Sequence, residues 1–400
     1  MDASAAHSKP VTGLILSGGG SRAAYQVGVL GAIADLLPDA ARNPFPVIVG
    51  TSAGAVNAVG LACGAMHFTQ AIHRLIGVWQ NFHCGRVYRS DWPGVLRQST
   101  RFLGHSLLGL GKDIPVALLD NAPLRDLLAR ELDFSGISAA VRTRQLRAVA
   151  VTAFGYESGQ ATTFYQGRAT IDPWFRHRRV GVPTRLGIEH LMASAAIPLL
   201  FPAVRLGREY FGDGAVRQTA PISPALHLGA SRVLVVGVSG NPVGPDVRLE
   251  APQPPAGRPP TLAQIGGHLL NSTFIDNLES DIELLERINH MSRAIEPDAR
   301  PRNLSSEQVD VLVISPSRPL DEIAARHRRE MPRAIRTFLR GPGATRASGA
   351  GVLSYLLFEP GYCNELIELG YQDAMAKRGD LQRFLGLESA PVRPQTIPAI

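Results

Sequence analysis

The sequence predicts an α/β fold in which a mostly parallel sheet carries helices on its faces. Two apolar runs, at residues 11–16 and 45–50, each lead into a glycine-containing turn and then into a helical pattern. This strand–helix order with short connections is typical of parallel sheets. Hydrophobic residues make up 45% of the 400 residues and charged residues 19%, so the chain can bury a substantial core, as one large domain or two smaller ones.

Helical and strand patterns alternate along the first part of the chain. After the first strand, Ala24, Val27 and Leu30 recur at helical spacing. A second helix is predicted over about residues 53–63, and residues 67–145 favour helices. The segments that follow are, in order, a strand at 146–156, a short helix at 188–198, a strand running into a tight turn at 208–216 and a buried strand at 231–240.

A cluster of prolines separates this part from the rest. Seven prolines fall between residues 241 and 261, a density that disfavours regular structure and predicts a linker or loop. Beyond it, residues 262–291 have apolar residues at helical spacing and residues 309–316 form the last clear strand pattern. The C-terminal part is predicted to be helical.

Composition bears on the compartment and on partners. The formal net charge is +7 and comes almost entirely from arginine, which suits an anionic surface such as lipid headgroups but follows equally from a genome-wide bias. Cys63, Cys84 and Cys363 form no C-x-x-C pair or metal-ligand spacing. Their odd number argues against a disulfide framework and favours a reducing compartment.

No targeting or membrane-spanning segment is expected. The N-terminus lacks the basic-then-apolar pattern of a signal peptide. Residues 45–70 carry no charge, but Pro46, Asn57 and many small residues within them indicate a strand, a turn and a helix. We therefore expect a cytoplasmic protein, at most peripheral to the inner face of the membrane.

The turn after the second strand reads Gly50-Thr51-Ser52-Ala53-Gly54, a G-x-S-x-G pattern. A sharp strand-to-helix turn has little room beside its central residue, so flanking glycines let that residue stand out for chemistry. The turn also lies at a helix N-terminus, where free N–H groups favour developing negative charge. Ser52 is therefore a candidate nucleophile, although the pattern also occurs in ordinary tight turns.

Three glycines, Gly18, Gly19 and Gly20, separate the first strand from the first helix. Their backbone N–H groups can converge on a phosphate or an oxyanion, and Arg22 is in reach of the same anion. No Gly-Lys-Ser/Thr follows, which excludes a P-loop, and Ala23 occupies the third glycine position of a dinucleotide fingerprint. An oxyanion loop ahead of a serine turn favours acyl-ester chemistry.

A catalytic serine needs a base, and two kinds are available. In a Ser-His-Asp triad of the α/β-hydrolase order the histidine comes last. The candidates would be His227, His268, His290 and His327. The other option is Asp213, which ends a strand with Gly214 behind it. A partly desolvated carboxylate there can take the serine proton directly, although an Asp-Gly hairpin turn is equally common.

The glycine loop, the serine turn and the aspartate turn, in this order, resemble the patatin-like phospholipase family. The resemblance rests on LSGGGSRAAYQVGVL, GTSAGA and FGDGA, with DNAPLRDLL and ASAAIPLLFPAV between the last two, and covers roughly residues 12–230. It implies a three-layer fold, with a central mostly parallel sheet between helices, and a Ser-Asp dyad without histidine.

Carried onto this chain, the resemblance implies that Ser52 is the nucleophile and Asp213 the general base. It further implies an oxyanion hole made by the backbone of Gly18, Gly19 and Gly20 with Arg22 nearby, and supporting roles for Gly50, Gly54, Gly214 and Ala215. The chain departs from the family at Ala23, because glycine usually follows the basic residue directly. The implied substrate is a lipid or phospholipid ester. No metal or cofactor is expected, because no ligand cluster is visible.

The same resemblance suggests how the chain is divided. We expect a catalytic domain at 12–230, a last core strand with the proline-rich linker at 231–260, and a mainly helical extension at 261–400 that packs on the catalytic domain. The extension is similar to that of a bacterial subgroup of the family through LSYLLFEPGYCNELIELGYQDA.

One stretch of this extension, residues 320–341, is basic and amphipathic. It combines Ile323, Met331, Ile335 and Phe338 with six arginines. Such a stretch either rests on an anionic membrane surface or buries its apolar face in the protein core. Peripheral membrane contact is therefore an expectation that the burial of these side chains can test.

The leading hypothesis is a serine acyl-hydrolase of lipid esters. Two alternatives stay open: a Ser-His-Asp esterase of the α/β-hydrolase type, and a non-catalytic lipid- or phosphate-binding module of the same fold. Nucleic-acid binding is disfavoured, because the arginines are spread along the chain without an aromatic platform motif.

Overall fold

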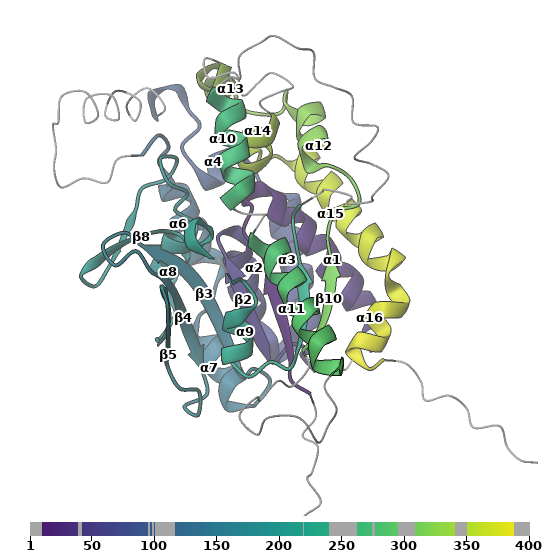
Figure 1. The fold of residues 1–400 in the computed structure, drawn as a ribbon. Coiled ribbons are helices and arrows are strands. Elements are labelled where there is room, and N and C mark those ends of the chain that lie inside the picture. The colour runs from purple at the N-terminus through teal and green to yellow at the C-terminus, as the bar shows by residue number, and fades with distance from the viewer. Residues whose placement is uncertain are drawn as a thin grey trace, which may run out of the picture.

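The computed structural model describes residues 10–38, 42–94, 97, 100, 117–218, 220–239, 262–273, 277–294, 309–340 and 350–387. Its described strands are β1 Thr12–Leu16, β2 Val47–Thr51, β3 Ala148–Gly155, β4 Ala161–Gly167, β5 Trp174–Arg176, β6 Arg179–Pro183, β7 Val204–Leu206, β8 Glu209–Asp213, β9 Arg232–Val236 and β10 Asp310–Ile314. They form one sheet in the order β10-β9-β1-β2-β3-β4-β6-β5, with β8 paired to β3 and β7 to β8 (Figure 1).

The sheet is mostly parallel, as predicted. β10, β9, β1, β2 and β3 run in the same direction, so their carboxyl ends meet at one edge. β4 and β8 both pair antiparallel with β3. β2 and β8 lie end to end along β3, because Thr51 of β2 pairs with Thr152, and Asp213 of β8 pairs with the next residue, Ala153.

Helices cover both faces of the sheet and make three layers (Figure 1). The described helices are η1 Gly20–Ala23, α1 Ala24–Leu36, α2 Ala53–Cys63, η2 Ala65–His67, α3 Phe68–Gln80, α4 Cys84–Val87, α6 Ala122–Glu131, α7 Ser135–Arg142, α8 Ile188–Ser194, η3 Gly214–Arg217, α9 Ser223–His227, α10 Leu262–Asn271, α11 Asn277–Ala294, α12 Leu320–His327, α13 Arg333–Arg340, α14 Ala350–Leu356, α15 Pro360–Ala376 and α16 Arg378–Leu385.

The central strands are apolar on both sides because each face is covered. Leu14 and Ile48 belong to the core on the side of α1, α2 and α3. Ile15 and Val49, one residue further along each strand, belong to the core on the side of α9 and α11. Successive side chains of a strand point to opposite faces, so a parallel strand buried on both sides reads as a continuous apolar run.

The sheet extends into the C-terminal part of the chain. β10 pairs in parallel with β9, with Asp310 beside Arg232 and Ile314 beside Val236. The strand expected at residues 231–240 is therefore not the last of the sheet, because the strand pattern at 309–316 joins its edge. The proline-rich linker lies outside the described residues, and the proposed domain boundaries stay a prediction.

α15 of the C-terminal part packs along α1 through glycines on both helices. A Cβ at Gly28 would lie 1.9 Å from the carbonyl oxygen of Ile367, and a Cβ at Gly370 would lie 2.1 Å from that of Tyr25. The two helix backbones thus approach so closely that no side chain fits between them. Tyr25 also donates from its hydroxyl to Asp373 at 3.0 Å, which adds a polar contact to the same interface.

The basic amphipathic stretch buries the three of its named apolar side chains whose burial the structure describes. It forms α12 and α13 with a break between them, and Ile323, Met331 and Ile335 are at most 1% exposed. These three side chains are therefore unavailable to a membrane surface, which favours the core alternative for this stretch, and peripheral membrane contact of the protein stays a prediction. None of the described helices combines the length and the apolar character that crossing a membrane requires.

Replacing Gly370 by alanine is expected to destabilise the fold. The added Cβ would clash with the backbone of Tyr25, and overpacking of this kind lowers the free energy of unfolding by about 1–3 kcal/mol or more. Gly379→Ala is the matched control, because a Cβ there meets nothing within 4 Å. Denaturant unfolding of both variants measures the difference, and equal midpoints would contradict the close packing of α15 on α1.

Candidate active site

Ser52 lies at the junction of β2 and α2 in a backbone conformation that few residues adopt. Its φ is 56° and its ψ is −130°, which turns the chain sharply from strand to helix. A Cβ at Gly50 would lie 2.5 Å from the carbonyl oxygen of Gly54, and a Cβ at Gly54 would lie 2.3 Å from that of Leu16. Both flanking glycines are thus required by close backbone contacts.

The Ser52 hydroxyl meets the carboxylate of Asp213. Its Oγ donates to Oδ2 of Asp213 at 2.5 Å. The contact follows from the sheet, because β2 ends where β8 ends on the shared edge of β3. The other carboxylate oxygen, Oδ1, accepts from the N–H of Ala215 at 2.9 Å. A Cβ at Gly214 would lie 2.1 Å from the carbonyl oxygen of Thr152, so this turn also needs its glycine.

Burial makes Asp213 an unusually basic carboxylate. Asp213 is 0% exposed and Ser52 is 1% exposed. Burial raises the pKa of Asp213 from 3.8 to about 7, against the opposing effect of the hydrogen bonds from Ser52 and from the Ala215 N–H. A carboxylate with a pKa in this range can accept a proton near neutral pH far better than an exposed one.

The glycine loop lies beside the start of α2. Because Gly54 packs against the carbonyls of Leu16 and Ser17, the first turn of α2 touches the end of β1 from which the loop departs. Gly20 has φ 57°, and a Cβ there would lie 2.2 Å from the carbonyl oxygen of Tyr355. A cavity of about 20 Å³, near the space of one water, is lined by residues of both regions, among them Gly18 and Thr51.

The family departure at Ala23 has a simple structural explanation. Ala23 has φ −65° and ψ −10°, an ordinary helical conformation, and leads directly into α1. Its side chain is fully buried. The backbone at this position therefore does not require glycine.

The position of the Arg22 guanidinium differs from the one expected from the sequence. The guanidinium was expected near the same anion as the glycines, but the structure engages it with the C-terminal helices. Nε donates to Ser354 Oγ at 2.9 Å, Nη2 donates to Asn271 Oδ1 at 3.3 Å, and Nη2 also forms an ion pair with Asp321. The guanidinium carbon lies 4.1 Å from the ring centre of Tyr355. The side chain is buried and its hydrogen bonds fasten the loop to α10, α12 and α14.

The four late histidines lie elsewhere. His227 stacks on Trp174 with ring centres 4.8 Å apart, and His327 contacts Glu330 and Glu365 through its two ring nitrogens. His268 and His290 are exposed on α10 and α11. Within the described ranges, none of the four forms a hydrogen bond with Ser52 or Asp213.

Two polar residues near Ser52 were not singled out from the sequence. Ser194, at the end of α8, accepts from the Ser52 N–H at 2.9 Å and donates to the carbonyl oxygen of Thr152 at 2.6 Å. Gln218 accepts from the Thr51 hydroxyl at 2.6 Å. Ser194 belongs to the segment ASAAIP, so the motif was visible, but its contact with the elbow depends on the tertiary fold.

A buried amide chain supports the glycine loop. Gln26 donates from Nε2 to the carbonyl oxygen of Ser17 at 2.8 Å, and Asn57 donates from Nδ2 to Gln26 Oε1 at 3.0 Å. Trp79 Nε1 completes the chain by donating to Asn57 Oδ1 at 2.8 Å. Because the C=O and N–H of one peptide point in opposite directions, holding the Ser17 carbonyl also orients the N–H of Gly18.

A family model described as patatin-like phospholipase matches residues 14–226, which is more than half of the chain. A curated relative, named cGAMP-activated phospholipase, comes from Pseudomonas aeruginosa (strain BWHPSA011 / Pa011). It is 30% identical over 217 residues, which cover 54% of this chain and 55% of the relative. The chain thus matches about half the length of that relative.

Two solved structures are also similar. VipD from Legionella pneumophila is 12% identical and has a TM-score of 0.36, with 95% of this chain and 67% of that chain covered. A chain of the SpcU–ExoU complex from the type III secretion system of Pseudomonas aeruginosa is 17% identical and has a TM-score of 0.21, with 39% and 34% covered. Because both TM-scores are low, the family assignment rests on the family model.

Replacing Asp213 by asparagine is expected to stabilise the fold at alkaline pH. The folded pKa of about 7 exceeds the ordinary value of 3.8, so the folded state binds the proton more tightly and loses stability as the pH rises between these values. Asparagine carries no charge, so its advantage in Tm should grow from near zero at about pH 4 to several degrees at about pH 8.

Calorimetry at both pH values measures this difference. The exposed Asp172 offers a control, because Asp172→Asn should shift Tm little at either pH. A Tm advantage of Asp213→Asn that is the same at both pH values would contradict a raised pKa for Asp213.

Proposed function

The chain belongs to the patatin-like phospholipase family, and from this premise we propose that it is a serine acyl-hydrolase of lipid esters. Ser52 is the nucleophile and Asp213 the general base. The observation that carries this proposal is the buried 2.5 Å hydrogen bond between the serine hydroxyl and the aspartate carboxylate. The name of the relative, a phospholipase, supports a phospholipid ester as the substrate.

In the first half of the reaction, Ser52 Oγ forms a bond to the ester carbonyl carbon while Asp213 accepts the hydroxyl proton. The carbonyl π electrons move to oxygen and give a tetrahedral oxyanion. When the oxyanion collapses, the bond to the alcohol breaks, and the alcohol takes the proton from Asp213. The product is an acyl-enzyme on Ser52.

In the second half, water replaces the alcohol. Asp213 accepts a proton from water, whose oxygen attacks the acyl carbon. Collapse of the second oxyanion breaks the bond to Ser52 Oγ, which regains its proton from Asp213. The fatty acid leaves and the site returns to its starting state.

We assign the oxyanion donors to the backbone of Gly18, Gly19 and Gly20. The Ser52 N–H is an unsuitable donor, because it already donates to Ser194 at 2.9 Å. The positive end of the α2 dipole points at the same place and favours the developing charge. Arg22 contributes by fixing the loop, because its guanidinium is engaged by Ser354 and Asp321.

Substitution of either member of the dyad should strongly reduce ester hydrolysis. We expect Ser52→Ala to lower kcat/KM for a chromogenic acyl ester by about 10⁴-fold or more, since no nucleophile is left. Asp213→Ala should lower it by about 10²–10⁴-fold, the usual effect of losing a general base. His327→Ala should retain activity, and circular dichroism should show that all variants are folded. An unchanged rate for Ser52→Ala would refute Ser52 as the nucleophile. A folded but inactive His327→Ala variant would favour a histidine base.

The pH dependence of the reaction should follow the ionisation of Asp213. Only the carboxylate can accept the serine proton, and its pKa is raised to about 7. We therefore expect kcat/KM to be constant above that pH and to fall about tenfold per pH unit below it. Values of kcat/KM for a neutral ester, measured against pH at constant ionic strength, give this profile. Activity that persists unchanged to about pH 5 would be incompatible with Asp213 as the base.

A further inference from the structure

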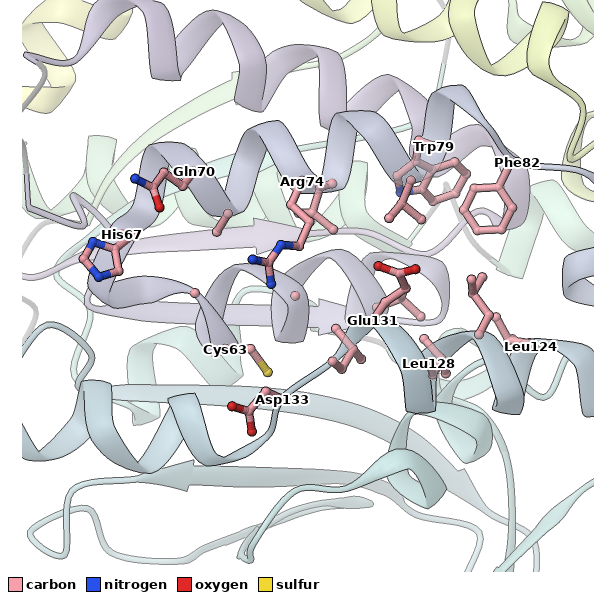
Figure 2. Close-up of a pocket in the computed structure, with 18 residues that line it drawn as sticks. Cys63, His67, Gln70, Arg74, Trp79, Phe82, Leu124, Leu128, Glu131 and Asp133 are labelled. Atoms are coloured by element: carbon pink, nitrogen blue, oxygen red, sulfur yellow. The ribbon is translucent and has the colours of Figure 1, made fainter.

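A groove runs along the outer side of α2, between α3 and α6 (Figure 2). It encloses about 240 Å³. Its lining is mainly apolar and includes Val56 and Gly60 of α2, Leu75 and Trp79 of α3, and Leu128 of α6. The dyad itself is not part of this lining, so the groove is an additional feature of the described structure.

One end of the groove lies near Ser52. Figure 2 shows Trp79, Phe82 and Leu124 gathered at one end and Cys63 toward the other. Trp79 Nε1 donates to Oδ1 of Asn57, in the first half of α2, whereas Cys63 ends that helix. The aromatic end of the groove is therefore the end closer to the start of α2, which Ser52 precedes directly.

The groove runs along one face of α2, the helix that begins directly after Ser52. Val56, Gly60, Cys63 and Gly64 line it, and residues spaced by three and four lie on one face of a helix. Val56 comes four residues after Ser52, which is about one helical turn. From Ser52 to Gly64 the helix rises about 18 Å, so the groove leads away from the dyad along most of α2.

We propose that this groove holds the acyl chain of the ester whose carbonyl reacts at Ser52. This inference rests on the proposed function. Because Ser52 and Asp213 are almost completely buried, the ester must reach them along a route through the protein surface. An aliphatic chain gains free energy by leaving water for apolar walls, and the groove offers such walls beginning one turn from the nucleophile.

Charged side chains along the groove make a strongly anionic ligand a poorer occupant. Arg74 lines it from α3, but Glu131 and Asp133 line the opposite side (Figure 2). The two carboxylates would repel an anionic ligand, whereas an uncharged acyl chain can pack against the apolar side chains between them.

Gly60 offers a way to block the groove half-way. A Cβ at this position would lie 2.9 Å from Leu75 Cδ2 and 3.8 Å from Leu132 Cδ2, and both leucines line the groove. Gly77 in α3 is a matched control, because a Cβ there meets nothing within 4 Å. Leucine at either position improves helix propensity to the same extent, so a difference between the variants that grows with acyl length reports on the groove.

The test is a series of acyl esters from butanoyl to hexadecanoyl. Gly60→Leu should retain kcat/KM for the shortest esters and lose at least tenfold on the longest, relative to Gly77→Leu. The loss grows with length because each methylene kept out of the groove forfeits about fourfold in kcat/KM. Val56 lies closer to Ser52, so Val56→Phe should lower kcat/KM for still shorter acyl chains than Gly60→Leu does. A parallel length profile for wild type and Gly60→Leu, or an equal loss at all lengths, would overturn the proposal.

A second measurement does not depend on catalysis. In the Ser52→Ala protein, a brominated hexadecanoate should quench the tryptophan fluorescence contributed by Trp79, and adding Gly60→Leu or Trp79→Phe should remove that quenching. Quenching without ester turnover in the wild type would leave the groove assignment standing and refute the proposed function. Ester turnover without quenching would refute the groove assignment and leave the proposed function standing.

Discussion

The site depends on one hydrogen bond, from the Ser52 hydroxyl to the Asp213 carboxylate. The sheet sets its length, because β2 and β8 meet end to end along the same edge of β3. Gly50 and Gly214 allow this meeting, since a Cβ at either would clash with a backbone atom. The geometry of the dyad therefore rests on strand register and on the sharp turns that these glycines allow at the ends of β2 and β8.

The burial that raises the pKa of Asp213 also destabilises the folded state when the carboxylate is ionised. Its carboxylate is buried with a hydroxyl and one backbone N–H as its hydrogen-bond partners among the described residues. Desolvation of this kind disfavours the charged form, which raises both the proton affinity and the free energy of the ionised folded state. Reactivity and local instability thus have one physical cause here, as is common at active sites.

The central strands and the sharp turns at Ser52 and Asp213 could be predicted because their signals are local, whereas the pairing of the two side chains was expected only from the resemblance of three motifs to a family. Continuous apolar runs identify strands buried on both faces, and glycines beside Ser52 and Asp213 identify the turns at their ends. The short strands at 161–183 were missed, because they are short, lack a continuous apolar run and lie toward an edge of the sheet. The partners of Arg22 could not be inferred either, since the contact with Ser354 spans 332 residues and leaves no periodic pattern.

That long-range contact also orders events during synthesis. The glycine loop emerges from the ribosome well before the groups that fasten it, because Asp321 and Ser354 follow Arg22 by 299 and 332 residues. Until they appear, the Arg22 guanidinium has no ion-pair partner to accompany it into the protein interior, and burying it alone is strongly unfavourable. A growing chain therefore cannot bury Arg22 with its partners, or fasten the glycine loop, before the segment that contains Ser354 and Tyr355 has been synthesised.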